Sequence, residues 1–294
     1  MRIASLLPAA TGIVGALGLA DDLVAVTFEC DDPPGIRERC PVVVDTALPR
    51  DLDPAGVDAV VRDRVARGLP MYELDRAALR HAAPDLVLTQ DLCRVCALPA
   101  GTVDDALADI GLDAAVCSID PHTLDDVFAA IEEVGQRAAR ADAAHRVVGG
   151  LRERLDVVAR AVAGLPSPRV LVLEWTDPPY RAGHWVPEMV RRAGATPLAG
   201  VDGGRSVATT WDDVRGERPD VVLVSPCGFG LDDAIDQARS VAEHLPGVPL
   251  VAIDSASYVV RAGPRLVDGI EALAGAWHPD AVPSAPTGRI ALLR

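Results

Sequence analysis

The chain has 294 residues, of which 49% are hydrophobic and 24% are charged, an ordinary composition for a folded protein. Its formal net charge of -15 at pH 7 repels phosphate backbones and anionic membrane surfaces, so nucleic acid is not an expected partner. One hydrophobic core rarely spans a chain of this length, which favours two lobes. Every apolar run is too short or too charged for a membrane span, so no membrane insertion is expected.

The apolar N-terminus predicts a strand over residues 2–7, a helix over 11–19 and a second strand over 23–28. A secretory signal also has an apolar run, but Pro8 interrupts this one, and acidic residues follow where cleavage would occur. The sequence therefore predicts a cytoplasmic protein. In that compartment the six cysteines are expected to be free thiols or metal ligands, not disulfides.

Short runs of Val, Leu and Ile alternate with helical patterns, which is typical of parallel sheets built from βαβ units. PDLVLTQDLC at 84–93 aligns with PDVVLVSPCG at 219–228, and ALADIGLDAAVCSID at 106–120 corresponds to SVAEHLPGVPLVAID at 240–254. This internal repeat predicts an α/β fold of two similar lobes with mainly parallel sheets.

Residues 123–165 contain no proline and have apolar residues at helical spacing, so a long connecting helix is expected between lobes at 1–122 and 166–294. Asp142 could begin a second helical segment, and two adjacent glycines, Gly149 and Gly150, weaken the middle. Because a helix resists bending, we expect the two lobes to open little about a hinge.

The Pro-rich stretch EWTDPPYRAGHW at 174–185 follows an apolar run and is rich in aromatic side chains. The chain has only four Trp, three Tyr and three Phe, yet Trp175, Tyr180 and Trp185 lie here beside His184. Trp and Tyr provide large rigid contact surfaces at low entropic cost, and loops beyond strand ends are where α/β proteins bind ligands. The cluster predicts ligand contact, and the alternative is an aromatic plug that closes the sheet.

A second cluster consists of cysteines that each follow a predicted strand, at the edge where ligands bind. They are Cys30, Cys93, Cys96 and Cys227. Together with His184, Cys30, Cys93 and Cys96 could hold zinc, an iron-sulfur cluster or the metal of a bound macrocycle. Because there is a single C-x-x-C, small buried thiols are the alternative, and a redox role for CRVC is a third interpretation.

Asp91 also follows a predicted strand and is a candidate ligand-binding carboxylate. Arg205 and Arg261 are candidates for contact with an acidic ligand group, with solvated surface arginine as the alternative. The sequence has no Ser-His-Asp grouping with nucleophile-elbow spacing, no P-loop and no G-x-G-x-x-G motif, so we expect a binding protein and not an enzyme.

Two α/β lobes joined by one helix resemble the helical-backbone class of ABC transporter substrate-binding proteins, which serve importers of iron-siderophores, haem and cobalamin. The likeness covers nearly the whole chain and is nearest to the cobalamin-binding branch. It is carried by SLLPAAT at 5–11, PDLVLTQ at 84–90, GHWVPEMVRRAGA at 183–195 and SYVVRAGPRLVDGIEAL at 257–273.

The resemblance implies a ligand in the cleft between lobes, held by aromatic rings and a few polar groups. By position, Trp175, His184, Trp185 and Trp211 would face it. The implied ligand is a cobalamin-like corrinoid or a related metal chelate, and the implied partner is an ABC permease, although the sequence predicts no export signal. The alternative function is a zinc- or iron-binding protein, or a metalloenzyme, that uses the cysteines.

Overall fold

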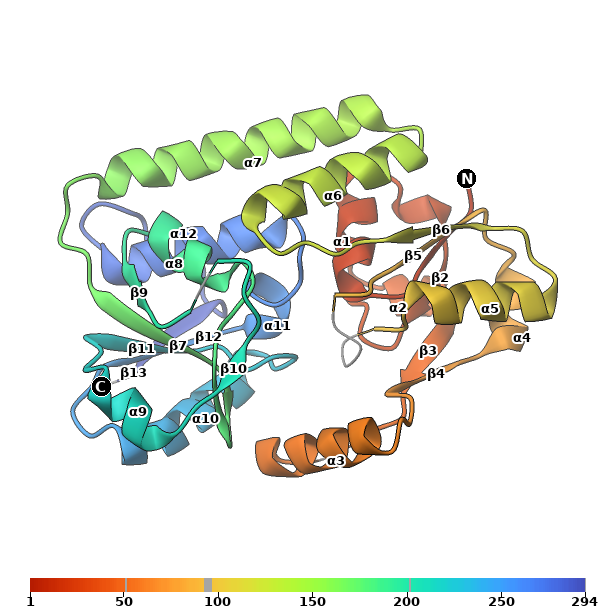
Figure 1. The fold of residues 1–294 in the computed structure, drawn as a ribbon. Coiled ribbons are helices and arrows are strands. Elements are labelled where there is room, and N and C mark those ends of the chain that lie inside the picture. Colours follow the sequence, from red (N-terminus) through yellow and green to blue (C-terminus); the bar gives the residue numbers. More distant parts are fainter. Residues whose placement is uncertain (51, 93–96, 201, 294) are drawn as a thin grey trace. The chain divides into compact units, whose positions relative to one another are not determined.

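A computed structural model describes residues 1–50, 52–92, 97–200 and 202–293 (Figure 1). The chain divides into two compact units, of which the first comprises residues 1–121 and 125–148 and the second comprises residues 122–124 and 149–294. Each unit is built on one β-sheet with helices on both faces. This architecture confirms the α/β fold with two lobes that the alternating pattern predicts.

The first unit contains a six-stranded sheet in the order β4-β3-β2-β1-β5-β6. β4 is antiparallel to β3, and all other neighbours are parallel. The strands are β1 (Ile3–Ser5), β2 (Leu23–Thr27), β3 (Val42–Thr46), β4 (Tyr72–Leu74), β5 (Leu86–Thr89) and β6 (Ala115–Ser118). The helices are α1 (Pro8–Ala16), the 3-10 helix η1 (Ala20–Asp22), α2 (Ile36–Arg39), α3 (Pro54–Ala66), α4 (Arg76–Ala82), α5 (Ala100–Ile110) and α6 (Leu124–Arg137).

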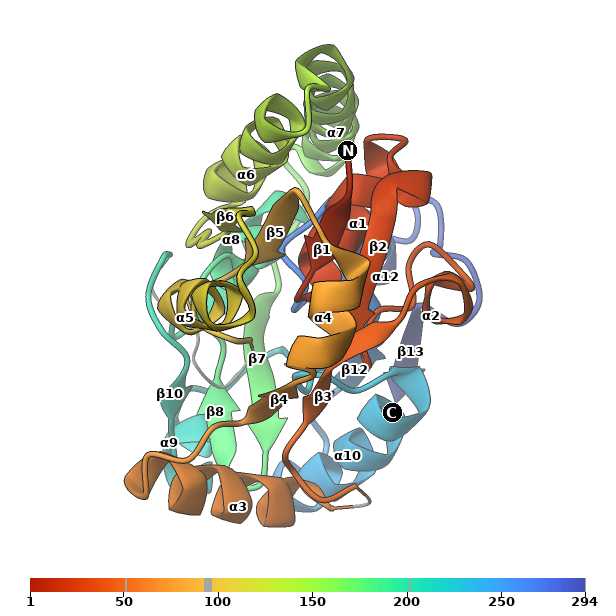
Figure 2. The same ribbon diagram turned by 90° about the vertical axis from the view of Figure 1, so that its right-hand side faces the viewer.

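Successive side chains of β1 point to opposite faces of this sheet. Ala4 packs in an apolar cluster with Leu79 of α4 and Leu107 of α5, whereas the Ser5 hydroxyl accepts a 2.8 Å hydrogen bond from Thr11 Oγ1 of α1. α1 therefore covers one face, and α4 and α5 cover the other (Figure 2). Pro8 is the first residue of α1, a position that tolerates proline because it needs no backbone N–H.

The second unit contains a sheet in the order β10-β8-β7-β11-β12-β13, with β9 paired to β7. β7, β9, β11 and β12 are parallel, whereas β8, β10 and β13 are antiparallel to their neighbours. The strands are β7 (Arg169–Thr176), β8 (Pro179–Arg181), β9 (Thr196–Leu198), β10 (Val207–Ala208), β11 (Val221–Val224), β12 (Leu250–Ile253) and β13 (Ile290–Leu293). The helices are α8 (Val186–Arg192), α9 (Trp211–Gly216), α10 (Leu231–His244), α11 (Ser255–Tyr258) and α12 (Arg265–Trp277).

α9 and α10 pack on one face of the second sheet, and α8 and α12 lie on the other (Figure 1). The core on the α10 side joins Leu171 and Leu173 of β7 to Ala234 and Ala238 of α10. The crossover β11-α10-β12 has the same parallel arrangement as β5-α5-β6 in the first unit. This correspondence confirms the internal repeat seen in the sequence.

The structure differs from the predicted single connecting helix, because α6 ends at Arg137 and three residues separate it from α7 (Ala141–Val162). Ala139 adopts a positive φ of 54°, and the amide of Arg140 donates to the Gly135 carbonyl at 2.6 Å. The two helices form a hairpin, with His145 Nδ1 lying 3.2 Å from Glu132 Oε1 (Figures 1 and 2).

α7 continues without a break through Gly149 and Gly150, and the division between the two units falls just before Gly149. Neither glycine has another atom within 4 Å of the position that a Cβ would occupy. At Gly135, by contrast, a Cβ would lie 2.4 Å from the Cβ of Ala144, so a glycine is required for the hairpin to pack.

None of the helices in the described ranges combines the length and the apolar character that a bilayer crossing requires.

Replacing glycine by alanine should change the stability of the protein in opposite directions at two positions of the α6–α7 hairpin. Gly149→Ala should stabilise the protein by up to about 1 kcal/mol, because alanine loses less backbone entropy in an exposed helix interior. Gly135→Ala should destabilise it by about 1–3 kcal/mol, because the added methyl overlaps Ala144. Urea unfolding followed by circular dichroism measures both, and equal effects would contradict the hairpin geometry.

Candidate functional site

Three rings meet at the carboxyl ends of neighbouring strands in the second unit. Trp175 is the next-to-last residue of β7 and is paired across strands with Tyr180 of β8. Phe229 follows β11, and its ring centroid lies 5.6 Å from that of Trp175. All three rings are half-buried, and the Trp175 indole donates to the Asp177 carbonyl at 3.1 Å. This aromatic triad of Trp175, Tyr180 and Phe229 occupies the edge where α/β sheets bind ligands.

Trp185 does not join the aromatic triad. Its side chain is buried, and its Nε1 donates a 2.8 Å hydrogen bond to the Val259 carbonyl. It immediately precedes α8, so its ring packs inside the unit, as the alternative of an aromatic plug predicts. This burial agrees with the alternative, and contact of Trp185 with a ligand stays a prediction.

Trp211 is also separate from the aromatic triad. Its ring stacks on His244, with centroids 4.1 Å apart and planes inclined by 6°. His244 is the last residue of α10, whereas Phe229 precedes the first residue, and a 14-residue helix is about 21 Å long. The expected common ligand surface of Trp175 and Trp211 is therefore not formed, because the two rings lie at opposite ends of α10.

His184 is presented by a turn that backbone contacts hold on both sides. Its φ is 52°, its amide donates to the Gly204 carbonyl at 2.5 Å, and its own carbonyl accepts from the Gly203 amide at 3.1 Å. Its ring centroid lies 6.0 Å from that of His122. Burial, followed by the charges of His122 and Arg205, lowers the pKa of His184 below its usual 6.5. The imidazole is consequently neutral at pH 7.

Asp91 follows β5, as the sequence predicts, but its carboxylate has internal partners. Oδ1 accepts a 3.0 Å hydrogen bond from the amide of Ala100, the first residue of α5, and Oδ2 accepts one of 3.1 Å from the Ser118 hydroxyl. These contacts fix the start of α5 against the end of β6. A direct role for Asp91 in ligand binding stays a prediction.

Arg261 lies half-buried between α11 and α12. In the same region the Arg265 guanidinium donates to the Tyr258 hydroxyl at 2.9 Å and lies over its ring, 4.6 Å from the centroid. Contact of Arg261 with an acidic ligand group stays a prediction.

The cysteines divide between buried and exposed thiols. Cys30 is fully buried, with its Sγ 2.9 Å from Thr11 Oγ1 and 3.3 Å from Thr27 Oγ1, which agrees with the alternative of a structural thiol. Cys93 and Cys96 lie outside the described residues, so their proposed metal ligation stays a prediction. Within the part of the chain that the structure describes, no three His, Cys, Asp or Glu side chains are grouped to hold a metal ion.

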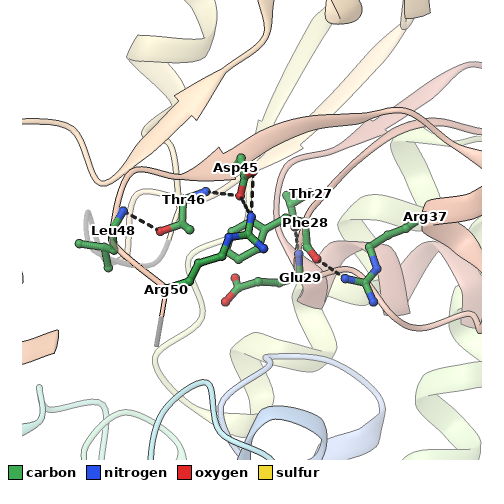
Figure 3. A network of polar contacts seen from close by, with 8 residues as sticks. All are labelled: Thr27, Phe28, Glu29, Arg37, Asp45, Thr46, Leu48 and Arg50. Carbon is green, nitrogen blue, oxygen red and sulfur yellow. Dashed lines mark hydrogen bonds and ion pairs between the residues drawn. The ribbon is translucent and has the colours of Figure 1, made fainter. Parts of the chain in front are cut away.

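The first unit carries a polar and aromatic network that the sequence analysis did not single out (Figure 3). Phe28 directly follows β2, and its ring centroid lies 6.5 Å from that of Tyr72 and 5.9 Å from the guanidinium carbon of Arg50. Arg50 Nη2 donates to both carboxylate oxygens of Asp45, at 2.9 and 3.0 Å. The signal that could have found this group is the position of Phe28, which directly follows the end of β2.

The loop that carries Arg50 is held by turns of its own (Figure 3). The Thr46 amide donates to Asp45 Oδ1 at 2.7 Å, and the Leu48 amide donates to the Thr46 hydroxyl at 3.0 Å. On the other side of Phe28, Arg37 donates to its carbonyl at 2.6 Å. A planar guanidinium held over an aromatic ring makes this the second aromatic surface at a carboxyl strand edge.

No protein-family model matches the chain, and no curated protein matches its sequence. Solved structures do match. A periplasmic haem-binding protein from Pseudomonas aeruginosa is 21% identical with a TM-score of 0.70, covering 100% of this chain and 98% of that one. The periplasmic vitamin B12 binding protein BtuF of Vibrio cholerae is 20% identical with a TM-score of 0.66, covering 93% and 94%. A possible iron-binding periplasmic solute-binding protein from Staphylococcus epidermidis is 20% identical with a TM-score of 0.67, covering 94% and 98%.

The chain has the fold of these substrate-binding proteins. The resemblance seen in the sequence is thereby confirmed at the level of the fold, and it extends over nearly the whole chain. At identities near 20% the likeness concerns the arrangement of elements, so the ligand has to be argued from the side chains.

The lowered pKa of His184 predicts a pH-dependent loss of stability. Well above pH 6.5 the imidazole is neutral in both states and contributes no pH dependence. As the pH falls below 6.5, the unfolded chain takes up the proton first, so stability declines until the lower folded-state pKa is reached. His184→Asn, which tolerates a positive φ, should remove this decline, which is at most about 1.4 kcal/mol per pH unit.

Urea unfolding between pH 7.5 and 5 measures this difference, and His81→Asn on the exposed side of α4 is the matched control. The control should keep the pH dependence of the original protein. Parallel stability curves for the original protein and His184→Asn would show that the buried imidazole does not cause the decline.

Thiol labelling should follow burial. Iodoacetamide should modify the exposed Cys227 under native conditions, whereas Cys30, Cys40 and Cys117 should react only after unfolding. Burial also raises the pKa of Cys40 and Cys117, which further slows their reaction. Peptide mass spectrometry locates each label. Fast labelling of Cys30 under native conditions would favour a role as a metal ligand over that of a buried structural thiol.

Proposed function

We propose that this chain is a solute-binding protein for a cobalamin-like corrinoid or a related metal-chelate macrocycle, and not an enzyme. The observation that carries the proposal is the aromatic triad of Trp175, Tyr180 and Phe229, half-buried at the carboxyl ends of β7 and β11. The fold supports it, because the structurally similar proteins are described as binding haem, vitamin B12 or iron.

The physics of the aromatic triad suits a flat macrocycle. Aromatic rings in contact gain about 0.5–1.5 kcal/mol beyond the free energy of the area they bury. The rings of the triad are held in place before any ligand arrives, by the β7–β8 pairing and by the indole hydrogen bond to Asp177. Such preorganisation reduces the entropy that ligand binding would otherwise lose.

An ABC permease as partner and a cytoplasmic location remain predictions from the sequence. The alternative function, zinc or iron held by Cys30, Cys93, Cys96 and His184, also remains a prediction from the sequence. Metal analysis of the purified protein distinguishes the alternatives, since stoichiometric zinc or iron would favour metal binding over macrocycle binding.

The proposal predicts that cyanocobalamin, haemin or a ferric siderophore quenches tryptophan fluorescence on titration. Trp175→Leu should weaken binding of the ligand found by at least about tenfold, or 1.4 kcal/mol. Trp211→Leu is the matched control and should leave affinity unchanged, because that ring stacks on His244 at the far end of α10. If none of the three ligands gives quenching or a heat signal up to about 1 mM, the proposal is wrong. A Kd of that size corresponds to a binding free energy of only about 4 kcal/mol.

A further inference from the structure

The sheet of the second unit has an open edge at β13. This strand is the last in the order β10-β8-β7-β11-β12-β13, and within the described ranges β12 is its one strand neighbour. The backbone N–H and C=O groups on the outer side of β13 therefore have no strand to pair with in this part of the chain. Such a row of backbone groups is a template for the addition of another strand.

The other edge strands carry features that oppose strand addition. β4 has the exposed Glu73 at its centre, β10 is only two residues long, and β6 exposes only the small Ala115. β13 has neither a charge nor a proline. Its Leu292 is 64% exposed, the highest value among the large hydrophobic side chains of the described residues. β13 is therefore the least protected of these edges.

Apolar side chains of β13 lie on both faces of the sheet. Leu293 pairs with Leu250, which belongs to the apolar core beneath α10. Ala291 lies two residues before Leu293 and shares that face, whereas Leu292 points to the opposite face. Both faces of β13 thus offer apolar surface to an added strand.

An apolar cavity of about 330 Å³ borders β13 on the α10 face. Its lining comes from the C-terminal half of α10, the loop before β12 and the ends of β12 and β13, and includes Ala238, Arg239, Ala242, Leu250 and Leu293. α10 and the sheet therefore leave apolar surface uncovered next to the open strand. We name β13 and this cavity together the β13 edge.

The two faces of β13 decide how a second copy of this chain pairs with it. A two-fold axis perpendicular to the sheet makes two β13 strands antiparallel and keeps both α10 helices on the same face. Opposite residues of paired strands share a face, so the axis has to pass through a residue. An axis through Leu292 places the two copies of this leucine opposite each other, which removes the most exposed apolar side chain from water.

The charges of α10 suit the same arrangement. Asp236 and Arg239 are exposed and form an ion pair within the helix, and Arg239 also lines the cavity. Because the axis makes the two α10 helices antiparallel, Asp236 of each copy lies toward Arg239 of the other. β13 itself is uncharged, so its pairing with a copy brings no like charges together on the strand. This local complementarity offsets part of the repulsion that a net charge of -15 produces between copies.

We propose that the β13 edge binds a second copy of this chain, with the two β13 strands antiparallel about Leu292. The inference goes beyond the proposed function and does not rest on it, because the aromatic triad lies on β7, on β8 and after β11. A pairing of four residues is a small interface, so the dimer is weak and its population depends on protein concentration.

Sedimentation equilibrium of the full chain between about 1 and 500 µM measures this association. Leu292→Lys should raise the dimer Kd at least about tenfold, or 1.4 kcal/mol, because two lysines would lie opposite each other. Val157→Lys is the matched control and should leave the Kd unchanged, since this valine is 57% exposed on α7. A chain that stays monomeric over this range, or a dimer that Leu292→Lys leaves unchanged, would overturn the proposal.

A charge exchange on α10 tests the orientation of the two copies. Arg239→Asp should weaken the dimer, because it leaves two carboxylates on each helix where the copies meet. Asp236→Arg combined with Arg239→Asp should restore the original Kd, because the exchange recreates opposite charges between the helices. If the double variant dimerises no better than Arg239→Asp, the antiparallel arrangement of α10 is wrong.

A disulfide crosslink locates the axis. Cys227→Ser first removes the exposed thiol. In that background Leu292→Cys should give a covalent dimer when diamide oxidises the two thiols, because opposite Cβ atoms of paired strands lie about 4.5–5.5 Å apart. Val207→Cys is the control on the other edge strand, where this valine is 60% exposed, and should stay monomeric. Equal crosslinking of both variants, or of neither, would contradict an axis through Leu292.

Discussion

The pairing of β7 with β11 is the interaction on which the second unit depends. Val170 to Leu173 of β7 are matched residue for residue with Val221 to Val224 of β11, and most of these side chains are buried. Because the two strands are parallel and in register, they end at the same edge. That shared edge brings Trp175 next to Phe229, and the turn into β8 adds Tyr180.

A second constraint is the close approach of two chain segments around Gly183. The backbone of Arg205 occupies the space that any side chain at position 183 would need, and this contact places His184 beside Gly203. Burial then keeps His184 neutral at physiological pH, so that its imidazole acts as a hydrogen-bonding group. Local backbone geometry thereby decides the chemistry available at this turn.

Two arginines that lie close to aromatic or imidazole side chains differ in their electrostatic partners. In the first unit Arg50 lies over Phe28 and is neutralised by Asp45 (Figure 3). In the second unit Arg205 has no carboxylate partner among the described residues.

The sequence by itself determined the fold class, the internal repeat and the group of rings at the end of β7, because periodic apolar runs and turn residues are local signals. It also indicated that Asp142 could begin a second helix, but the turn at Ala139 depends on Gly135 packing against Ala144, a contact between helices. Only the tertiary structure decided which rings share a surface. Trp185 turns into the core and Trp211 lies at the far end of α10, because ring positions depend on packing between segments that are distant in the chain.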